Sequence, residues 1–279
     1  MTEPSSPVET LQLRSGSGAT TAAASLVPGR GAIITSWQAG GRERLYLDEA
    51  TLADPTKNVR GGIPLLFPSP GKLEEGKYTR GGKSGALKQH GFARDLPWTV
   101  AERSPSSATL ALASNDATRA VYAWDFAASL RVTLTERALR LDLRVTNTGA
   151  DTMPFGFGIH PYFLVQDKAH ASIRTAATRA YDNVAKTDIP FRGFDLAHGE
   201  TDLHLLDHGS TESALTSDDG RVLVHASLEF GRWVVWTLPA KNFVCLEPWT
   251  APGNALNTGE GLIELGPGEH RDLWIELSV

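Results

Sequence analysis

Apolar and polar residues alternate along much of this chain with a period of two, which is typical of β-strands. The clearest case runs from Ala138 to Asn147, where Leu or Val occupies every second position between polar residues. The segment Phe126–Leu134 alternates in the same way, and Glu136 and Arg137 supply a short polar connection between the two. The pattern predicts an antiparallel hairpin in which each strand buries one face.

Further β-like runs are separated by turns rich in Gly, Pro, Asn and Asp. They are Gly31–Trp37, Leu45–Leu47, Trp98–Glu102, Ala108–Ala113, Arg221–Glu229, Arg232–Leu238, Phe243–Leu246 and His270–Leu277. Only Thr51–Ala53 and Thr118–Ala123 favour a turn or two of helix, because no segment carries a sustained 3.6-residue apolar repeat. The fold class that we predict is all-β, as an antiparallel sandwich or barrel.

Two stretches are predicted to be long loops. Pro68–Leu87 is rich in Gly and Lys, and Asp182–Ser210 is rich in His and Asp. Loops of this length on a β scaffold are usually functional or mobile. Neither a linker nor a repeat divides the chain, so we expect one domain over residues 1–279, with residues 1–8 as a flexible N-terminal tail.

The composition is that of an ordinary globular protein, with 41% hydrophobic and 21% charged residues. The net charge of -5, with basic residues scattered, argues against nucleic acid or an anionic membrane as the partner. No secretory signal or bilayer-spanning apolar run is recognised. The single cysteine, Cys245, excludes an intramolecular disulfide and a cysteine-rich metal site. We therefore expect a cytoplasmic protein that is a monomer or a weak dimer and holds no metal.

The first candidate for chemistry is His160, which lies in the apolar and glycine-rich stretch from Phe155 to Phe163. Pro161 fixes its own φ and favours extended geometry at His160, so the imidazole has a defined direction. With an ordinary pKa of about 6.5, a partly desolvated His beside a polar cavity is suited to proton transfer near neutrality. The alternative is a hydrogen-bonded core histidine.

Glu247 is the second candidate, since it lies at the end of the apolar strand that begins at Phe243. Burial there would raise its pKa and make it a candidate base, unless the side chain faces solvent or pairs with an Arg. His90 and Arg94 lie in a short polar cluster before Trp98, where a solvated turn is the alternative.

Arg60 precedes two glycines that allow backbone to approach a ligand closely, and its guanidinium offers a planar fork of donors for hydroxyl or phosphate oxygens. The following Ile-Pro-Leu-Leu-Phe-Pro is too rich in proline for a phosphate-binding loop that opens a helix.

As an ordered set, these motifs resemble the aldose 1-epimerase, or galactose mutarotase, superfamily, and within it the branch of the glucose-6-phosphate 1-epimerases. The set is Arg60-Gly-Gly-Ile-Pro with a following Phe-Pro, then Gln89-His90-Gly-Phe-Ala-Arg94, His160-Pro-Tyr, Leu246-Glu247-Pro and a closing Gly-Pro-Gly-Glu. It extends over nearly the whole chain from about Gly31. The resemblance implies a large antiparallel β-sandwich with a concave sugar-binding face.

The resemblance also implies roles for three residues. His160 would be the general acid that protonates the pyranose ring oxygen, and Glu247 the base that removes the proton of the anomeric hydroxyl. His90 would hydrogen-bond and polarise the ring-oxygen side. The ring would open to the aldehyde and reclose as the opposite anomer, without any cofactor. Each well-placed group would contribute about 10² to 10⁴ in rate.

A sugar-binding Asp is implied as well, and we place it at Asp202, with Asp195 and Asp207 as rivals. The basic side chains of Arg60 and Arg94 are the candidate partners of a 6-phosphate, with Lys88 nearby. One departure argues against a phosphorylated substrate. After the Ile-Pro stretch, this sequence has Phe-Pro-Ser-Pro-Gly where the glucose-6-phosphate branch has aromatic and Gly residues. We expect a hexose or a hexose 6-phosphate.

Tyr162 and Phe67 are candidate apolar platforms for the C–H face of the sugar, as are Trp236 and Trp249. Trp236 lies in an apolar run, which favours a core position instead.

Three alternatives stay open. A glycosidase would use Asp202 and Glu247 as its carboxylate pair, which leaves the two histidines without roles. A non-catalytic sugar-binding module would use the same face without proton transfer. A metal site formed by three histidines is the third possibility, and they are His198, His204 and His208.

Overall fold

The computed structural model describes residues 9–18 and 21–279, so the predicted tail at residues 1–8 lies outside the described residues. Strands dominate the described part, and the predicted all-β class is confirmed. The helical pieces are α1 (Glu49–Ala53), α2 (Asp116–Arg119), α3 (Ala255–Thr258) and 3₁₀ turns at Pro28–Arg30, Glu74–Gly76 and Lys168–His170.

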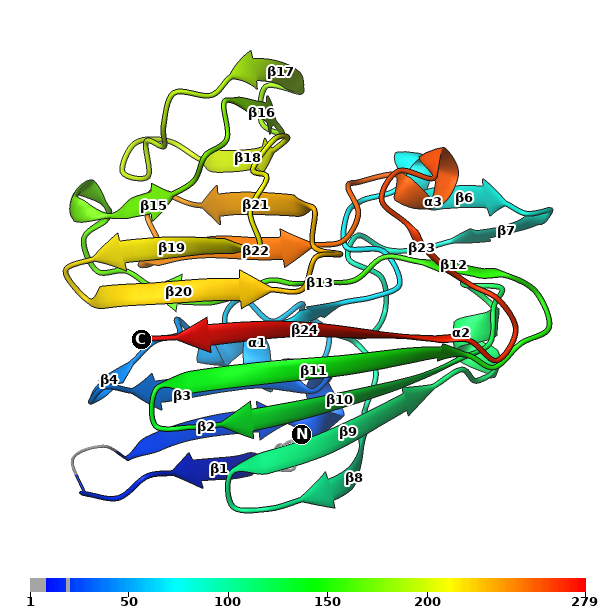
Figure 1. Ribbon diagram of the computed structural model, residues 1–279, viewed down its shortest axis with the longest axis horizontal. Coiled ribbons are helices and arrows are strands. Elements are labelled where there is room, and N and C mark those ends of the chain that lie inside the picture. Colours follow the sequence, from blue (N-terminus) through cyan, green and yellow to red (C-terminus); the bar gives the residue numbers. More distant parts are fainter. Residues whose placement is uncertain (1–8, 19–20) are drawn as a thin grey trace, which may run out of the picture.

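One eight-stranded antiparallel sheet, here the back sheet, contains the longest strands. Figure 1 shows β24 between β20 and β11, with β10, β9 and β8 following in order. The strands, in spatial order, are β15 (Ser172–Arg174), β19 (Glu212–Ser217), β20 (Gly220–Ala226), β24 (His270–Ser278), β11 (Ala138–Asn147), β10 (Phe126–Leu134), β9 (Ser107–Ala113) and β8 (Thr99–Arg103). The predicted hairpin is confirmed as β10 and β11, with an uninterrupted register from Phe126↔Asn147 to Leu134↔Leu139.

A second sheet, here the front sheet, is built of shorter strands. In spatial order they are β17 (Thr187–Pro190), β16 (Arg179–Asp182), β18 (Thr201–Leu205), β21 (Arg232–Thr237), β22 (Phe243–Trp249), β13 (Gly158–Ile159) and β5 (Leu65–Leu66), with β14 (Tyr162–Leu164) also paired to β22. One face of this sheet contributes residues such as Val235 and Leu246 to the same hydrophobic cluster as Leu141 and Ile275 of the back sheet. The other face, here the site face, carries two small separate clusters.

The remaining strands form smaller sheets. They are β1 (Leu11–Ser15), β2 (Ala22–Val27), β3 (Ile33–Ala39) and β4 (Arg42–Glu43) in one sheet, β6 (Lys77–Arg80) with β7 (Lys83–Ala86), and β12 (Met153–Phe155) with β23 (Ile263–Leu265). The single domain over residues 1–279 stays a prediction.

Three predictions of local structure were wrong. The stretch 68–87 contains the β6–β7 hairpin, and the stretch 182–210 contains β17 and β18, because short polar strands lack a clear alternation of apolar residues. Leu45–Leu47 forms only isolated bridges, to Phe163 and Gly61.

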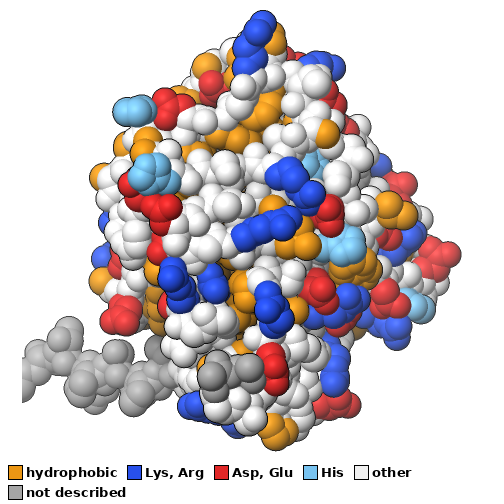
Figure 2. Space-filling view, turned by 60° about the vertical axis from the view of Figure 1, so that its left-hand side comes forward, with side chains coloured by type: hydrophobic (Ala, Val, Ile, Leu, Met, Phe, Trp, Pro, Cys, Tyr) orange, Lys and Arg blue, Asp and Glu red, His pale blue; other side chains and the backbone are white. Residues whose placement is uncertain are grey.

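The surface carries mixed charge. On the face shown in Figure 2, Lys and Arg side chains alternate with Asp, Glu and hydrophobic side chains. None of the helices in the described part of the chain has the length and apolar character that crossing a bilayer requires.

Candidate active site

Strand β22 places Glu247 on the site face. Alternate residues of a strand face opposite sides, and Val244 and Leu246 belong to the main core, so Cys245, Glu247 and Trp249 face the other way. The prediction that Glu247 ends its strand was wrong, because β22 continues through Pro248 to Trp249. The carboxyl group therefore lies inside a strand that is buried along its whole length, and Glu247 is only 1% exposed.

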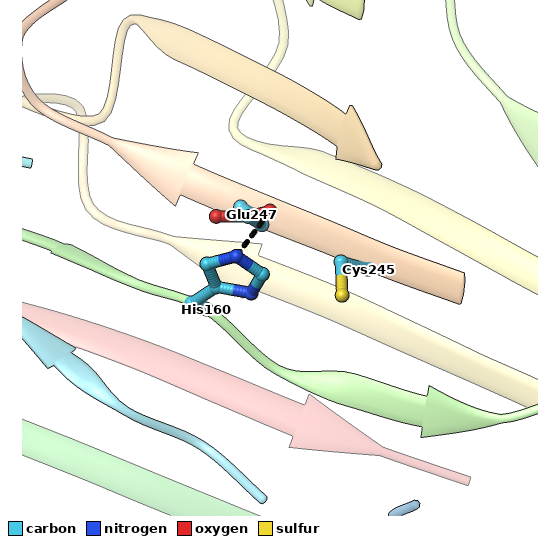
Figure 3. A group of neighbouring side chains, drawn as sticks. All are labelled: His160, Cys245 and Glu247. Atoms are coloured by element: carbon cyan, nitrogen blue, oxygen red, sulfur yellow. Dashed lines mark ion pairs between the residues drawn. The ribbon is translucent and has the colours of Figure 1, made fainter. Parts of the chain in front are cut away.

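His160 reaches Glu247 from the neighbouring chain segment between β13 and β14. Both strands pair with β22 in one register, since Gly158 lies opposite Trp249 and Tyr162 opposite Cys245. Continued through the interruption at Pro161, this register sets His160 opposite Glu247. Figure 3 shows the two side chains pointing toward one another, with His160 Nε2 3.4 Å from Glu247 Oε1.

The aromatic neighbours hold both groups in place. The Trp249 indole N–H donates to Glu247 Oε2 at 3.1 Å, which leaves Oε1 facing the imidazole. The Tyr162 ring stacks on the His160 ring with 4.6 Å between centroids. Gly158 is needed here, because a Cβ at this position would lie 2.6 Å from Trp249 Cδ1.

His90 lies beside His160 on the site face. The alternative of a solvated turn was wrong, since His90 is only 8% exposed. Its φ of 73° is left-handed, and its ring centroid lies 5.6 Å from that of His160. The Nδ1–H donates to the carbonyl of Pro70, which can only accept. Burial and the positive charge of Arg94 lower the pKa of His90 to about 4. The neutral ring therefore presents an unprotonated Nε2, which is an acceptor.

Burial acts in opposite directions on the His160–Glu247 pair. It lowers the pKa of His160 well below the ordinary value, and the charges of His90, Arg94 and Arg60 act in the same direction. It raises the pKa of Glu247 well above the ordinary value, to which the negative charge of Asp202 adds. The pair consequently favours one proton between its two members, neither gaining a second nor losing the first easily.

Strand β18 contributes two polar side chains further across the site face. The register of β21 puts Trp236 beside Cys245, and the register of β18 puts Asp202 beside Trp236. Asp202 Oδ2 accepts from Asn183 Nδ2 at 2.6 Å, and Oδ1 lies 3.6 Å from His204 Nε2. His204 was considered only as a metal ligand and not as a neighbour of Asp202, although alternation along β18 puts both side chains on one face.

The two rivals of Asp202 lie elsewhere. Asp195 accepts from the backbone and ring of His198 among exposed residues, and Asp207 accepts from Thr178. Asp202 is therefore the one of the three whose charge acts on Glu247.

Two arginines lie at the edge of this group. Arg60 is exposed, with Cζ 5.9 Å from the Trp236 ring centroid. Burial lowers the pKa of Arg94, whose Nη2 donates to the Gln89 carbonyl at 3.0 Å and whose buried Nε has no partner. The Lys88 side chain is 81% exposed, and its Nζ lies 3.9 Å from Asp95 Oδ2.

Two aromatic assignments change. Trp236 is only partly buried, and its ring centroid lies 5.6 Å from that of His160, so the core position favoured by the sequence was wrong. Phe67 instead belongs to the core, because its ring packs in an aromatic cluster away from the site face. The cluster consists of Phe67, Phe92, Tyr122, Phe126 and Phe155.

The three histidines of the alternative metal site do not meet. His198 pairs with Asp195, His204 with Asp202, and His208 bonds to Thr175 and the Glu212 carbonyl. Among the described residues, two other groups have metal-ligand atoms within 4.8 Å of one another, namely His160–Cys245–Glu247 and Asp167–His170–Asp218.

The family model described as aldose 1-epimerase matches residues 13–278, so the chain belongs to that family of sugar-epimerising enzymes. A protein of Cenchrus ciliaris named "Putative glucose-6-phosphate 1-epimerase" is 28% identical over 275 residues, which cover 86% of this chain and 76% of the relative.

Solved structures have the same fold. The Slr1438 protein of Synechocystis sp. PCC 6803 is 34% identical with a TM-score of 0.94, covering 100% of this chain and 98% of that one. A galactose mutarotase-like protein of Lactobacillus casei ATCC 334 is 21% identical with a TM-score of 0.79, covering 96% of this chain and 99% of that one.

Proposed function

We propose that this protein interconverts the α and β anomers of a hexose or hexose 6-phosphate by opening and reclosing the pyranose ring. The observation that carries the proposal is the contact of His160 Nε2 with Glu247 Oε1 at 3.4 Å in a buried setting. The anomeric hydroxyl and the ring oxygen are bonded to the same carbon, so an acid and a base that serve them must lie close together.

The proton content of the pair fits this reaction. In the charged arrangement, His160 gives its proton to the ring oxygen while Glu247 takes the proton of the anomeric hydroxyl, and the C1–O5 bond breaks. The resulting neutral pair then faces the open aldehyde. Rotation about the C1–C2 bond exposes the other face of the carbonyl, and both transfers run backwards. The pair holds one proton throughout, apart from those of the sugar.

His90 takes a different role from the one expected at the ring oxygen. Its Nδ1–H is committed to Pro70, and the free Nε2 can only accept. We assign it to a sugar hydroxyl, which can donate, rather than to the ring oxygen, which cannot. Asp202 is assigned to a second hydroxyl, and Trp236 and Tyr162 to the C–H face of the sugar.

Arg60 and Arg94 are assigned to the 6-phosphate if the substrate carries one. The name of the Cenchrus ciliaris relative supports a phosphorylated substrate. Glycoside hydrolysis is less well supported, because the group in contact with Glu247 is an imidazole and not the second carboxyl group that such enzymes use.

The test is proton exchange spectroscopy on equilibrated glucose, galactose and their 6-phosphates. Catalysis transfers saturation between the two anomeric proton signals at a rate proportional to protein concentration. Release of sugar from a glycoside would identify a glycosidase instead. A binding module would show no exchange in the wild type. Its sugar affinity would persist in the His160→Ala, Glu247→Ala double variant. Absence of exchange for all four sugars contradicts the proposal.

A further inference from the structure

A thiol lies beside the acid–base pair and takes no part in the proposed reaction. Cys245 and Glu247 are two residues apart on β22, so both side chains face the site (Figure 3). A ring nitrogen of His160, the sulfur of Cys245 and a Glu247 oxygen all lie within 4.8 Å of one another. Cys245 is 0% exposed, Glu247 1% and His160 7%.

We propose that His160, Cys245 and Glu247 form a site for a thiophilic divalent cation such as Zn²⁺, which inhibits the enzyme reversibly. Its inhibitory consequence rests on the proposed function, whereas binding of the metal does not. The ligand set of one imidazole, one thiolate and one carboxylate is of the kind that Zn²⁺ uses when a fourth position stays open.

The distances support a tetrahedral ion. His160 Nε2 and Glu247 Oε1 lie 3.4 Å apart, which is longer than a good hydrogen bond. Two such ligands on one tetrahedral Zn²⁺ lie ~3.4 Å apart, because each bond is about 2.1 Å long. A sulfur and a nitrogen on the same ion lie ~3.6 Å apart, so the thiol must approach by at most about 1.2 Å.

An unpartnered atom gives an independent indication. His160 Nδ1 is buried and has no hydrogen-bond partner, although the residue is 7% exposed. The stacked Tyr162 ring holds the imidazole in place, so this buried nitrogen is available as a ligand atom without the loss of any hydrogen bond.

Charge balance favours occupation. Binding of Zn²⁺ releases the thiol proton and the single proton of the pair. The two negative charges of thiolate and carboxylate then neutralise the ion in a site that excludes water.

The ion would bind His160 and Glu247, the two side chains that must transfer protons to and from the sugar. Inhibition should therefore be competitive with sugar and reversed by a chelator. No oxidation or covalent step is involved.

The experiment uses the full chain, the variants Cys245→Ala and Cys245→Ser, and His170→Asn as the matched control. His170 belongs to the exposed Asp167–His170–Asp218 group, which is the competing metal candidate. Two measurements are made: Co²⁺ binding by absorption, where a thiolate ligand gives a near-ultraviolet charge-transfer band, and sugar exchange rates in buffered free Zn²⁺.

We expect wild type and His170→Asn to bind one Co²⁺ with the thiolate band and to lose activity in Zn²⁺. Both Cys245 variants should keep their metal-free activity, lack the band, and need at least tenfold more free Zn²⁺ for the same inhibition. The serine variant preserves side-chain volume should the alanine variant fold poorly. A wild-type Co²⁺ complex without the band, or equal Zn²⁺ sensitivity in the Cys245 variants, overturns the proposal. If no sugar is exchanged at all, the proposed function fails, while the Co²⁺ band still decides whether the site exists.

Discussion

The back and front sheets divide the work of this molecule. In the back sheet, β10 and β11 pair without interruption, and their residues alternate between the core and the surface. In the front sheet, β22 is buried on both faces, and its neighbour is interrupted between β13 and β14, where His160 lies. Regular pairing stabilises the back sheet, whereas the front sheet gives up part of its regularity to hold ionisable groups in a buried row.

The largest effect that we expect is on catalysis, from Glu247→Gln. The amide keeps the shape and still accepts from the Trp249 N–H, so the fold should persist, while the base is lost. The exchange rate should fall by about 10² to 10⁴. Glu260→Gln is the control, because that carboxylate is exposed and pairs with Arg232, the first residue of β21, and its rate should stay within about twofold. A Glu247→Gln enzyme that retains a tenth of its rate would contradict the assigned base.

Leu141→Ala should act in the opposite way. Leu141 lies on β11, is 2% exposed and packs in the main core, so its truncation should lower the free energy of unfolding by about 2 to 5 kcal/mol. Urea unfolding measures this, and kcat per folded molecule should not change. Arg144→Ala on the same strand removes an exposed ion pair with Asp272 and should cost less than about 1 kcal/mol. If Leu141→Ala lost as much kcat as Glu247→Gln, the division between a stabilising back sheet and a catalytic front sheet would be wrong.

The same division explains what could be predicted from the sequence. The alternation of apolar and polar residues predicted the bounds of β10 and β11, Phe126–Leu134 and Ala138–Asn147, because each strand has one buried and one more exposed face. Strand β22 lacks that signal, since both its faces are buried, and its end was placed too early. The alternation of apolar and polar residues is lost in a strand that carries ionisable groups on a buried face.

The site required more than spacing. His160 and Glu247 were paired through a family resemblance, and their contact depends on a register that continues across a broken strand, which no local pattern encodes. We expected Phe67 beside the sugar and favoured the core for Trp236, whereas Phe67 lies in the core and Trp236 lies beside His160. An aromatic residue in an apolar run gives no indication of which sheet face its side chain takes. The acceptor state of His90 depends on the Pro70 carbonyl, and backbone partners of this kind follow only from the folded chain.

A smaller effect is expected from Arg60→Ala, at the edge of the site face. If the sugar carries a 6-phosphate, loss of a charge-assisted contact worth about 1.5 to 3 kcal/mol should lower kcat/KM for glucose 6-phosphate roughly 10- to 100-fold and leave glucose nearly unchanged. Lys88→Ala is the matched control, since its side chain is 81% exposed and pairs with Asp95. Equal losses for both sugars would remove Arg60 from phosphate binding.

The smallest effect is a difference in pH dependence between a site histidine and a surface histidine. Hydrogen bonding to Asp218 raises the pKa of exposed His170 above its ordinary value of 6.5, whereas burial lowers that of His160 well below it. A lowered pKa means that the pair gains its second, inactivating proton only below pH 6.5. With a chelator present, the exchange rate should therefore hold to within about twofold from pH 7.5 down to 6.5 and fall only at lower pH. Ring-proton spectra should show His170 titrating above 6.5 in the same range, and His170→Asn should leave the rate profile unchanged. An acid limb centred above pH 6.5 would show that His160 is solvated like His170, and the contrast between the two regions would be lost.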